Sequence, residues 1–143
     1  MAGRIMASLQ FGVFDEFKGA RTLLLWGDES GIAALQAAFR ELADEACGVM
    51  ALHETGWAKG IRGTRLFLDL ARSYSGEPVK LSKVDGAPDI IWNGTRDEFA
   101  CCADLIEPLL NPSKPSGHQY LDSNQNFVLK IMVSRGEYPV DLR

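Results

Sequence analysis

The last quarter of the chain is rich in side chains that can do chemistry. Within it, residues 117–139 carry an imidazole, two phenols and two carboxylates, from His118, Tyr120, Asp122, Glu137 and Tyr138. Imidazole and carboxylate groups are the common general acids and bases of enzymes. Alternation along a strand would place residues 118, 120 and 122 on one face. The segment therefore predicts a pocket framed by these three residues and closed by Glu137 and Tyr138. The alternative is an ordinary solvent-facing strand face.

Trp57 is the second candidate for a functional residue. It lies in a glycine-bearing segment, residues 55–63, together with Lys59 and Arg62. A tryptophan beside basic groups is typical of a protein-contact hot spot. An equal alternative is a lid folded onto a sheet. If Trp57 is a central anchor, we expect Trp57→Ala to weaken binding by more than about 2 kcal/mol.

Other chemistries lack the residues that they need. The histidines, His53 and His118, form no short-spaced pattern with each other or with cysteine, so no metal is predicted. No phosphate-binding loop and no GxSxG motif occurs. Cys102 lies on an apolar helix stripe, and Cys47 and Cys101 also read as inert thiols. The sequence therefore predicts no catalytic residue and no cofactor.

Composition narrows the class of protein. The chain has 143 residues, which is the size of one domain, here residues 1–143. Its net charge of −4 and the absence of a basic cluster argue against nucleic acid as a partner. Its apolar runs are too short for a membrane span or a signal peptide. The three cysteines do not form a disulfide framework, so we expect a cytoplasmic protein with no membrane partner.

Hydrophobic periodicity predicts the elements of the first half. Alternation over residues 8–13 and an apolar run over 21–26 predict a hairpin. Asp28 or Ser30 can cap a helix that runs to about Ala46. Residues 49–53 and 64–70 read as strands, with a loop over 55–63 between them. The helix should bury one stripe, which consists of Ile32, Leu35, Phe39 and Leu42.

The second half repeats strand and helix signals. Weaker strands are expected over 78–83 and 89–92. Thr95 and Glu98 have the spacing of a capping box, which predicts a helix start. Pro108 should shorten or kink that helix near its end. Strands over 118–121 and 127–133 close the chain.

These elements follow each other in the order ββαββ(ββ)αββ. Helices that bury one stripe must pack on a sheet that is apolar on one face. The predicted fold is therefore α+β, a two-layer sandwich of a mostly antiparallel sheet and two helices. No internal repeat is visible in the residue types.

Several segments carry a resemblance to known proteins. Residues Gly117 to Asp122, Ser134 to Pro139, Phe11 to Asp15 and Thr22 to Gly27 are similar to segments of small bacterial proteins, some of which resemble immunity proteins of toxin systems. The likeness covers most of the chain in layout. It implies a small acidic binding protein rather than an enzyme, and it assigns no catalytic residue.

Two functional hypotheses follow, and we favour the first. The first is a non-enzymatic module that binds a protein partner, with Trp57 and the ends of the C-terminal hairpin in contact. The second is a small enzyme or ligand-binding protein whose pocket lies near His118, Tyr120 and Asp122. Self-association through an open sheet edge, for example as a homodimer, is a third alternative.

Overall fold

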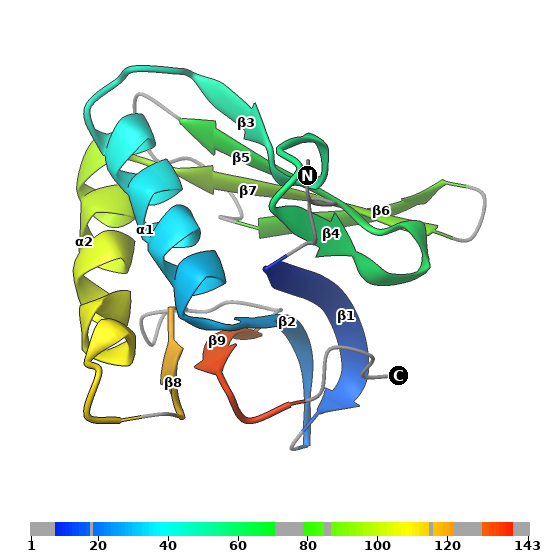
Figure 1. Ribbon diagram of the computed structural model, residues 1–143. Coiled ribbons are helices and arrows are strands. Elements are labelled where there is room, and N and C mark those ends of the chain that lie inside the picture. The colour runs from blue at the N-terminus through cyan, green and yellow to red at the C-terminus, as the bar shows by residue number, and fades with distance from the viewer. Residues whose placement is uncertain are drawn as a thin grey trace, which may run out of the picture.

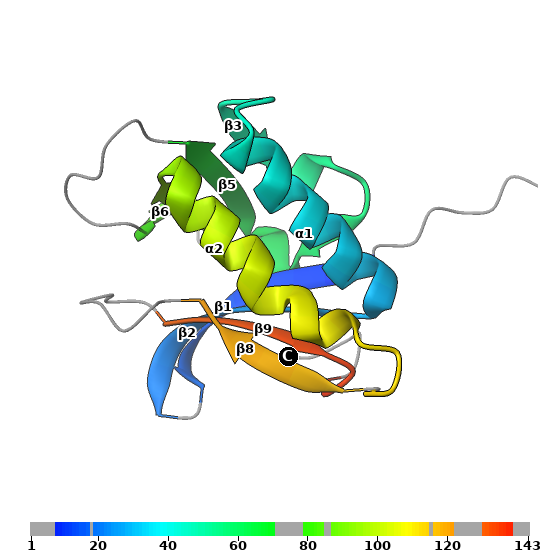
Figure 2. The ribbon, with the colours of Figure 1, turned by 90° about the vertical axis from the view of Figure 1, so that its left-hand side faces the viewer.

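The computed structural model describes residues 8–17, 19–70, 79–84, 87–114, 116–121 and 130–138. Two helices lie side by side, with two β-sheets on the other side of the molecule (Figure 1, Figure 2). The helices are α1 (Glu29–Ala43) and α2 (Arg96–Ile106). The strands are β1 (Leu9–Phe17), β2 (Ala20–Gly27), β3 (Val49–Ala51), β4 (Ala58–Gly60), β5 (Arg65–Leu70), β6 (Val79–Val84), β7 (Ala87–Gly94), β8 (Gly117–Tyr120) and β9 (Lys130–Arg135). Short 3₁₀ helices are η1 (Leu52–Glu54), η2 (Ile61–Gly63) and η3 (Glu107–Leu110).

Among the described residues, the strands form a five-stranded sheet, β4-β1-β2-β9-β8, and a four-stranded sheet, β3-β5-β7-β6. The α+β class is confirmed. A mostly antiparallel sheet is not confirmed, because the β1–β4, β2–β9 and β5–β7 pairs are parallel and both sheets are mixed. For the β2–β9 and β5–β7 pairs the cause is the path of the helices. Each helix carries the chain from one sheet to the other, where a strand that follows it pairs in parallel with a strand that precedes the other helix.

The two halves of the chain repeat one arrangement of a hairpin, a helix and a strand pair. In the first half these are β1-β2, α1 and β3/β5, and in the second they are β6-β7, α2 and β8/β9. Gly27 and Gly94 occupy equivalent positions at the ends of β2 and β7. Gly27 pairs with Arg135 on β9, and Gly94 pairs with Leu70 on β5. A helix N-cap follows each glycine directly. Each sheet therefore combines the hairpin of one half with the strand pair of the other.

The helix caps form as the sequence predicts. Asp28 is the N-cap of α1, and its Oδ1 accepts a hydrogen bond from the amide of Gly31 at 2.9 Å. Thr95 and Glu98 form a reciprocal capping box at the start of α2. These bonds satisfy amides that the first helical turn leaves without a partner, so they set where each helix begins.

The main core lies between the helices and the inner faces of both sheets. All four residues of the predicted α1 stripe are fully buried in it. Phe39 stacks on Phe99 at 6.0 Å and meets Trp92 edge-on at 5.5 Å between ring centroids. A second, smaller cluster lies on the opposite face of the five-stranded sheet, which we call the outer face. It is built from Leu24, Trp26 and Met132, with Phe14, Ile61 and Tyr138 packed against it.

Some predicted bounds differ from the structure. The segment 55–63, expected to be a loop, contains β4, which pairs in parallel with the start of β1. The strand predicted over 49–53 ends at Ala51 and continues as η1, and α1 ends at Ala43 rather than about Ala46. Residues 127–129 of the last predicted strand lie outside the described residues. In the part of the chain that is described, no helix has the length and apolarity needed to cross a membrane.

Candidate binding site on the outer face of the five-stranded sheet

One row of side chains crosses all five strands of this sheet. Each member of the row is the direct register partner of the next. In order across the sheet they are His118 on β8, Ser134 on β9, Trp26 on β2, Gln10 on β1 and Lys59 on β4. The neighbours of Gln10 along β1, Leu9 and Phe11, point into the main core. Because side chains alternate along a strand, this row points to the outer face. We call these five residues the outer row.

Glu137 joins two members of the outer row. Its Oε1 accepts a hydrogen bond from the Ser134 hydroxyl at 2.8 Å, and both of its carboxylate oxygens lie 3.1 Å from His118 Nδ1. Ser134 is fully buried, whereas the side chains of His118 and Glu137 are 36% and 27% exposed. The ring of Tyr120 meets the His118 ring edge-on, with centroids 5.7 Å apart.

The order of these three groups decides what they can do. In a nucleophilic triad the base lies against the serine, and a carboxylate orients the base from behind. Here the carboxylate of Glu137 lies between the other two, and the Ser134 hydroxyl is directed at it. No imidazole nitrogen is therefore placed to take the proton of Ser134. The cluster instead fixes the chain after β9.

That segment, Gly136 to Tyr138, is called the clasp below. Gly136 has a φ of +72° and its amide donates to the Gly27 carbonyl at 3.2 Å, which prolongs the pairing of β9 with β2. A left-handed φ suits glycine because other residues are strained there. The turn directs Glu137 to the outer row and Tyr138 to the small outer cluster.

A pocket of about 190 Å³ lies beside the clasp. Its walls come from β1, β2, the N-cap of α1 and the clasp, namely Ser8, Gln10, Trp26, Gly27, Asp28, Gly136 and Tyr138. The side-chain oxygen of Gln10, Oε1, is buried and has no hydrogen-bond partner among the described residues. An unsatisfied buried amide oxygen costs free energy, so this end of β1 carries a local cost to stability.

The backbone at the start of β1 lies tightly over the N-terminus of α1. The Ser8 carbonyl would be only 2.1 Å from a Cβ placed at Gly27 or at Gly31, so both positions require glycine. The same carbonyl accepts from the Asp28 amide at 3.2 Å, and the Ser8 hydroxyl lies 3.0 Å from that of Ser30. These contacts fix the wall of the pocket formed by Ser8 and Asp28.

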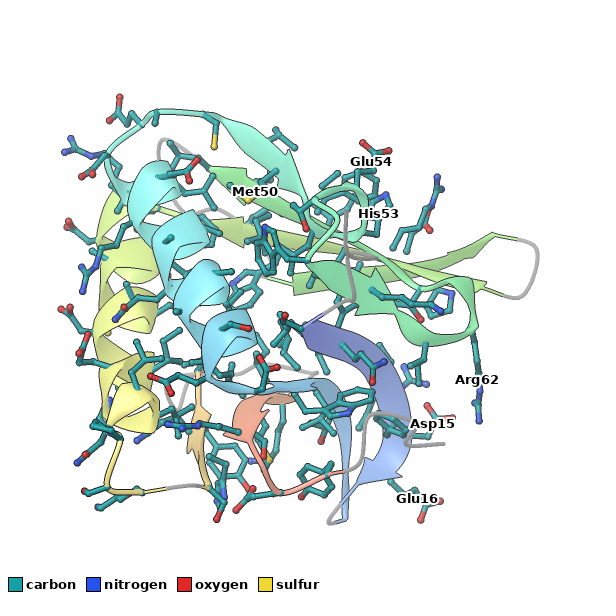
Figure 3. The ribbon with its side chains drawn as sticks, viewed as in Figure 1. Asp15, Glu16, Met50, His53, Glu54 and Arg62 are labelled. Atoms are coloured by element: carbon teal, nitrogen blue, oxygen red, sulfur yellow. The ribbon has the colours of Figure 1, made fainter. Side chains whose placement is uncertain are left out.

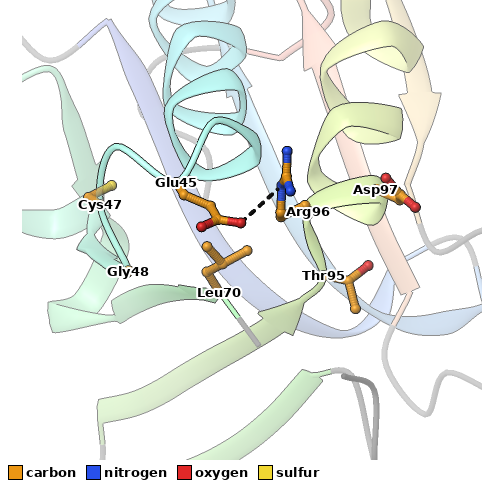
Figure 4. A pocket seen from close by; sticks show the side chains of 7 residues that line it. All are labelled: Glu45, Cys47, Gly48, Leu70, Thr95, Arg96 and Asp97. Atoms are coloured by element: carbon orange, nitrogen blue, oxygen red, sulfur yellow. Dashed lines mark ion pairs between the residues drawn. The ribbon is translucent and has the colours of Figure 1, made fainter. Parts of the chain in front are cut away.

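A larger cavity of about 730 Å³ lies at the other end of the helix pair (Figure 4). Two of its charged groups, Arg96 and Glu45, contact each other. Arg96 pairs with Glu45 at 3.1 Å and donates to the Ala43 carbonyl, and Thr95 belongs to the capping box. Burial and the nearby Glu41 raise the pKa of the Cys47 thiol, which keeps it protonated and weakly nucleophilic. The Arg96–Glu45 ion pair, the capping box and the protonated Cys47 therefore give this cavity no activated nucleophile.

His53 belongs to a separate cluster on the outer face of the four-stranded sheet. Figure 3 shows it beside Glu54. Its Nδ1 accepts from the Leu66 amide at 3.2 Å, and its ring meets Phe67 edge-on at 5.0 Å. These contacts hold the ring against β5, so His53 serves the fold there.

An ion pair lies on the same face, between Arg65 and Asp89 on adjacent strands. The guanidinium donates to both carboxylate oxygens of Asp89, at 2.8 and 2.5 Å. This hydrogen bonding holds the pKa of Asp89 below its ordinary value. The pair is bidentate, which is the strong geometry for arginine and carboxylate.

The structure brings four of the predicted site residues to one face. His118 contacts both Glu137 and Tyr120, and Tyr138 lines the adjacent pocket. Asp122 lies outside the described residues. Trp57 lies apart from them: its carbonyl accepts from the amides of Ser8 and Leu9, and its half-buried ring packs against the main core.

Sequence reasoning did not find Gln10, Trp26 or Ser134 as site residues. Trp26 is buried in the outer cluster. The sequence did carry one signal for Gln10, since it alternates with Leu9 and Phe11 and must face away from them. Within the described residues, no group of three His, Cys, Asp or Glu side chains is arranged to hold a metal ion.

Comparison with known proteins adds no relative. No protein-family model, no curated protein and no solved structure matches the chain.

Proposed function

We propose that the chain is a non-enzymatic protein-binding module that meets its partner with the outer row and the clasp. The observation that carries this proposal is the pocket beside the clasp, which lies next to the partly exposed His118 and Glu137 side chains of the same face. Its aromatic walls, Trp26 and Tyr138, are of the residue types enriched at interface hot spots. A side chain of a partner that enters the pocket would pack beside the clasp.

The side chains on this face support binding rather than catalysis. Glu137 lies between Ser134 and His118, so the serine hydroxyl donates to a carboxylate rather than to an imidazole. The buried Cys102 thiol has a raised pKa, because burial disfavours the thiolate. A raised pKa makes this cysteine a poor nucleophile.

A small-molecule-binding protein is the second candidate. The pocket favours it because it is concave and holds both apolar and polar walls. Its volume of about 190 Å³ lies below the range of roughly 300–1,000 Å³ that is usual for drug-sized ligands. A single side chain of a partner protein, or a very small ligand, suits this volume better.

Other aspects of the proposal rest on the sequence. A cytoplasmic location, a bacterial source and an immunity-like role follow the composition and the resemblance described above. Self-association stays an alternative: β4 and β8 are the edge strands of the five-stranded sheet, and an edge strand can pair with a second copy.

Affinity capture with matched variants tests the proposed face. The tagged chain is used as bait in its own cells' extract, and the captured partner is then titrated against purified variants. His118→Ala changes the outer row, and Val49→Ala is its control. Val49 is the equivalent residue on the four-stranded sheet. It lies on edge strand β3 and pairs with Asp69 on β5, in the way that His118 on edge strand β8 pairs with Ser134 on β9. We expect His118→Ala to weaken binding at least fivefold and Val49→Ala to leave it unchanged. Equal effects would contradict the proposal.

A separate variant tests whether Trp57 contacts the partner. Because its ring packs against the main core, Trp57→Ala is expected to lower the free energy of unfolding as well. Affinity is therefore measured per folded molecule, after the folded fraction is determined by circular dichroism. A loss of more than about 2 kcal/mol in binding would place Trp57 in the interface, and an unchanged affinity would remove it.

A further inference from the structure

We propose that the chain forms a twofold-symmetric dimer through the outer face of its four-stranded sheet, so that the occupant of this face is a second copy of the chain. The surface is separate from the outer row and the clasp, so the inference goes beyond the proposed function and does not depend on it. Three features carry it: an apolar row open to solvent, polar side chains without partners beside that row, and a charge match under a twofold rotation.

The side chains on this face follow from strand alternation. On β5 and β7 the residues Leu66, Leu68 and Ile90 are buried in the main core, so their neighbours along each strand point to the outer face. The register of the two strands then gives three rows, which are Arg65 with Asp89, Phe67 with Ile91, and Asp69 with Asn93.

The middle row is apolar and open to solvent. Ile91 is 36% exposed, and Phe67 beside it is half-buried. Of the three large apolar side chains that are exposed among the described residues, Val49 and Ile91 belong to this sheet. An antiparallel or mixed sheet with one face on the core usually has a polar second face. A row of apolar side chains across that face, with polar rows on both sides, is typical of an interaction surface.

The row on one side carries polar groups that lack partners. Asp69 and Asn93 are half-buried, and neither side chain forms a hydrogen bond or an ion pair in the part of the chain that the structure describes. A partly desolvated carboxylate is stabilised by a donor, above all by a charged one. These two side chains therefore favour an occupant that brings a cation to Asp69 and a hydrogen-bond acceptor to Asn93.

The row on the other side supplies that cation and that acceptor. Arg65 binds Asp89 through Nε and Nη2, while its Nη1 donates to no residue that the structure describes. Its guanidinium carbon lies 5.9 Å from the centre of the Phe67 ring, and its side chain is 49% exposed. An arginine has five N–H donors, so this one keeps the two on Nη1 for a second carboxylate.

A twofold axis along the apolar row brings these groups together. The rotation lays each strand on its own copy in the reverse direction, so Arg65 of one copy faces Asp69 of the other. By the same rotation Asp89 faces Asn93, and the apolar row packs on itself. Two sheets packed face to face keep their strands within about 30° of each other, which this arrangement allows. An interface between identical copies must be complementary to itself, and this face meets that condition. An axis parallel to the strands would instead oppose Arg65 to its own copy.

Sedimentation of the full chain over a concentration series tests the dimer. We expect a monomer–dimer equilibrium that Ile91→Glu weakens at least tenfold, because two carboxylates would meet in the apolar row. Asp104→Glu, which keeps the charge at an exposed position on α2, is the control and should leave self-association unchanged. A chain that stays monomeric at every concentration, or a dimer that folded Ile91→Glu leaves intact, would overturn the inference.

A charge exchange between two chains tests the twofold arrangement. Asp69→Lys puts two cations in opposition, and Arg65→Glu with Asp89→Asn puts two carboxylates in opposition. Neither chain should therefore dimerise alone. The second change in the latter chain removes the repulsion that Glu at position 65 would meet within its own copy. Mixed in equal amounts, the two chains restore opposite charges at both contacts and should form a heterodimer. No heterodimer from two chains that circular dichroism shows to be folded would overturn the arrangement.

The outcomes separate this inference from the proposed function. If Ile91→Glu is monomeric and binds the captured partner with unchanged affinity, the two faces act separately, as we infer. If His118→Ala dissociates the dimer and Ile91→Glu does not, the second copy binds at the outer row and this inference falls. If the parent chain is monomeric and Ile91→Glu loses the captured partner, the four-stranded sheet binds that partner, which overturns both the dimer and the proposed face.

Discussion

At the scale of single residues, Glu137 holds together the part of the outer row that lies on β8 and β9. It accepts from a buried serine on one side and faces an imidazole on the other. Both partners lie on strands of the five-stranded sheet, so this one carboxylate fixes the clasp against β8 and β9 together.

Ser134→Ala tests the value of that contact. The change removes a buried hydrogen bond to a charged group, which is worth about 1.5–3 kcal/mol. We expect the free energy of unfolding, measured with urea, to fall by this amount. Ser113→Ala is the control, because its hydroxyl bonds to Asn111 at an exposed position. A Ser134→Ala chain as stable as the parent would show that the bond contributes nothing.

Asp89 predicts how stability depends on pH. Its folded pKa is lowered by Arg65, so the ion pair stabilises the fold above the ordinary pKa of aspartate, about 4, and the benefit is lost as the pH falls through the folded value. We expect Asp89→Asn to lose stability at neutral pH and to match the parent in strong acid. Unfolding curves over this range check it. Asp104→Asn breaks the more exposed pair with Arg40 and should change stability less. A difference that persists unchanged in acid would contradict this reading.

At the scale of elements, the clasp depends on its glycine. Gly136→Ala places a Cβ at a φ of +72°, which is strained for alanine by about 1 kcal/mol. We expect lower stability and weaker binding of the captured partner, since Tyr138 would no longer be held against the outer cluster. Gly48→Ala is the control, because a Cβ there meets nothing within 4 Å and its φ is not left-handed. Equal effects of the two changes would show that the turn is not needed.

Local patterns predicted most elements but not their pairing. Alternation gave β1 and β5, and the capping box gave the start of α2, because these depend on residues close in sequence. β4 is only three residues long and exists because β1 offers it a partner, so its own residues carry no signal. Parallel and antiparallel strands show the same alternation of apolar and polar residues. The sequence therefore could not reveal that both sheets are mixed.

The candidate site was partly predictable for the same reason. His118, Tyr120 and Glu137 lie near one another in the sequence, and strand alternation places the first two on one face. Gln10 and Trp26 join them only through the β2–β9 pairing, which links residues more than a hundred positions apart. No local pattern reports such a pairing, and so the outer row becomes visible only in the fold.

At the scale of the whole molecule, each sheet depends on both halves of the chain. The hairpin of one half pairs in parallel with the strand pair of the other, in both sheets. We therefore expect fragments 1–74 and 75–143 to be largely unfolded alone and to form the native fold when mixed in equal amounts. Circular dichroism and analytical ultracentrifugation check this. A fragment that folds by itself as a monomer would contradict the interlocked arrangement.

The central claim is that the outer face of the five-stranded sheet is the binding surface. Hydrogen exchange of the chain, with and without its captured partner, tests it most directly. The account predicts slower exchange in the first residues of β1, in β8 and in the clasp from Gly136 to Tyr138, with no change in β3 and β5. Protection confined to β3 and β5, or to the segment around Trp57, would place the partner elsewhere and contradict the claim.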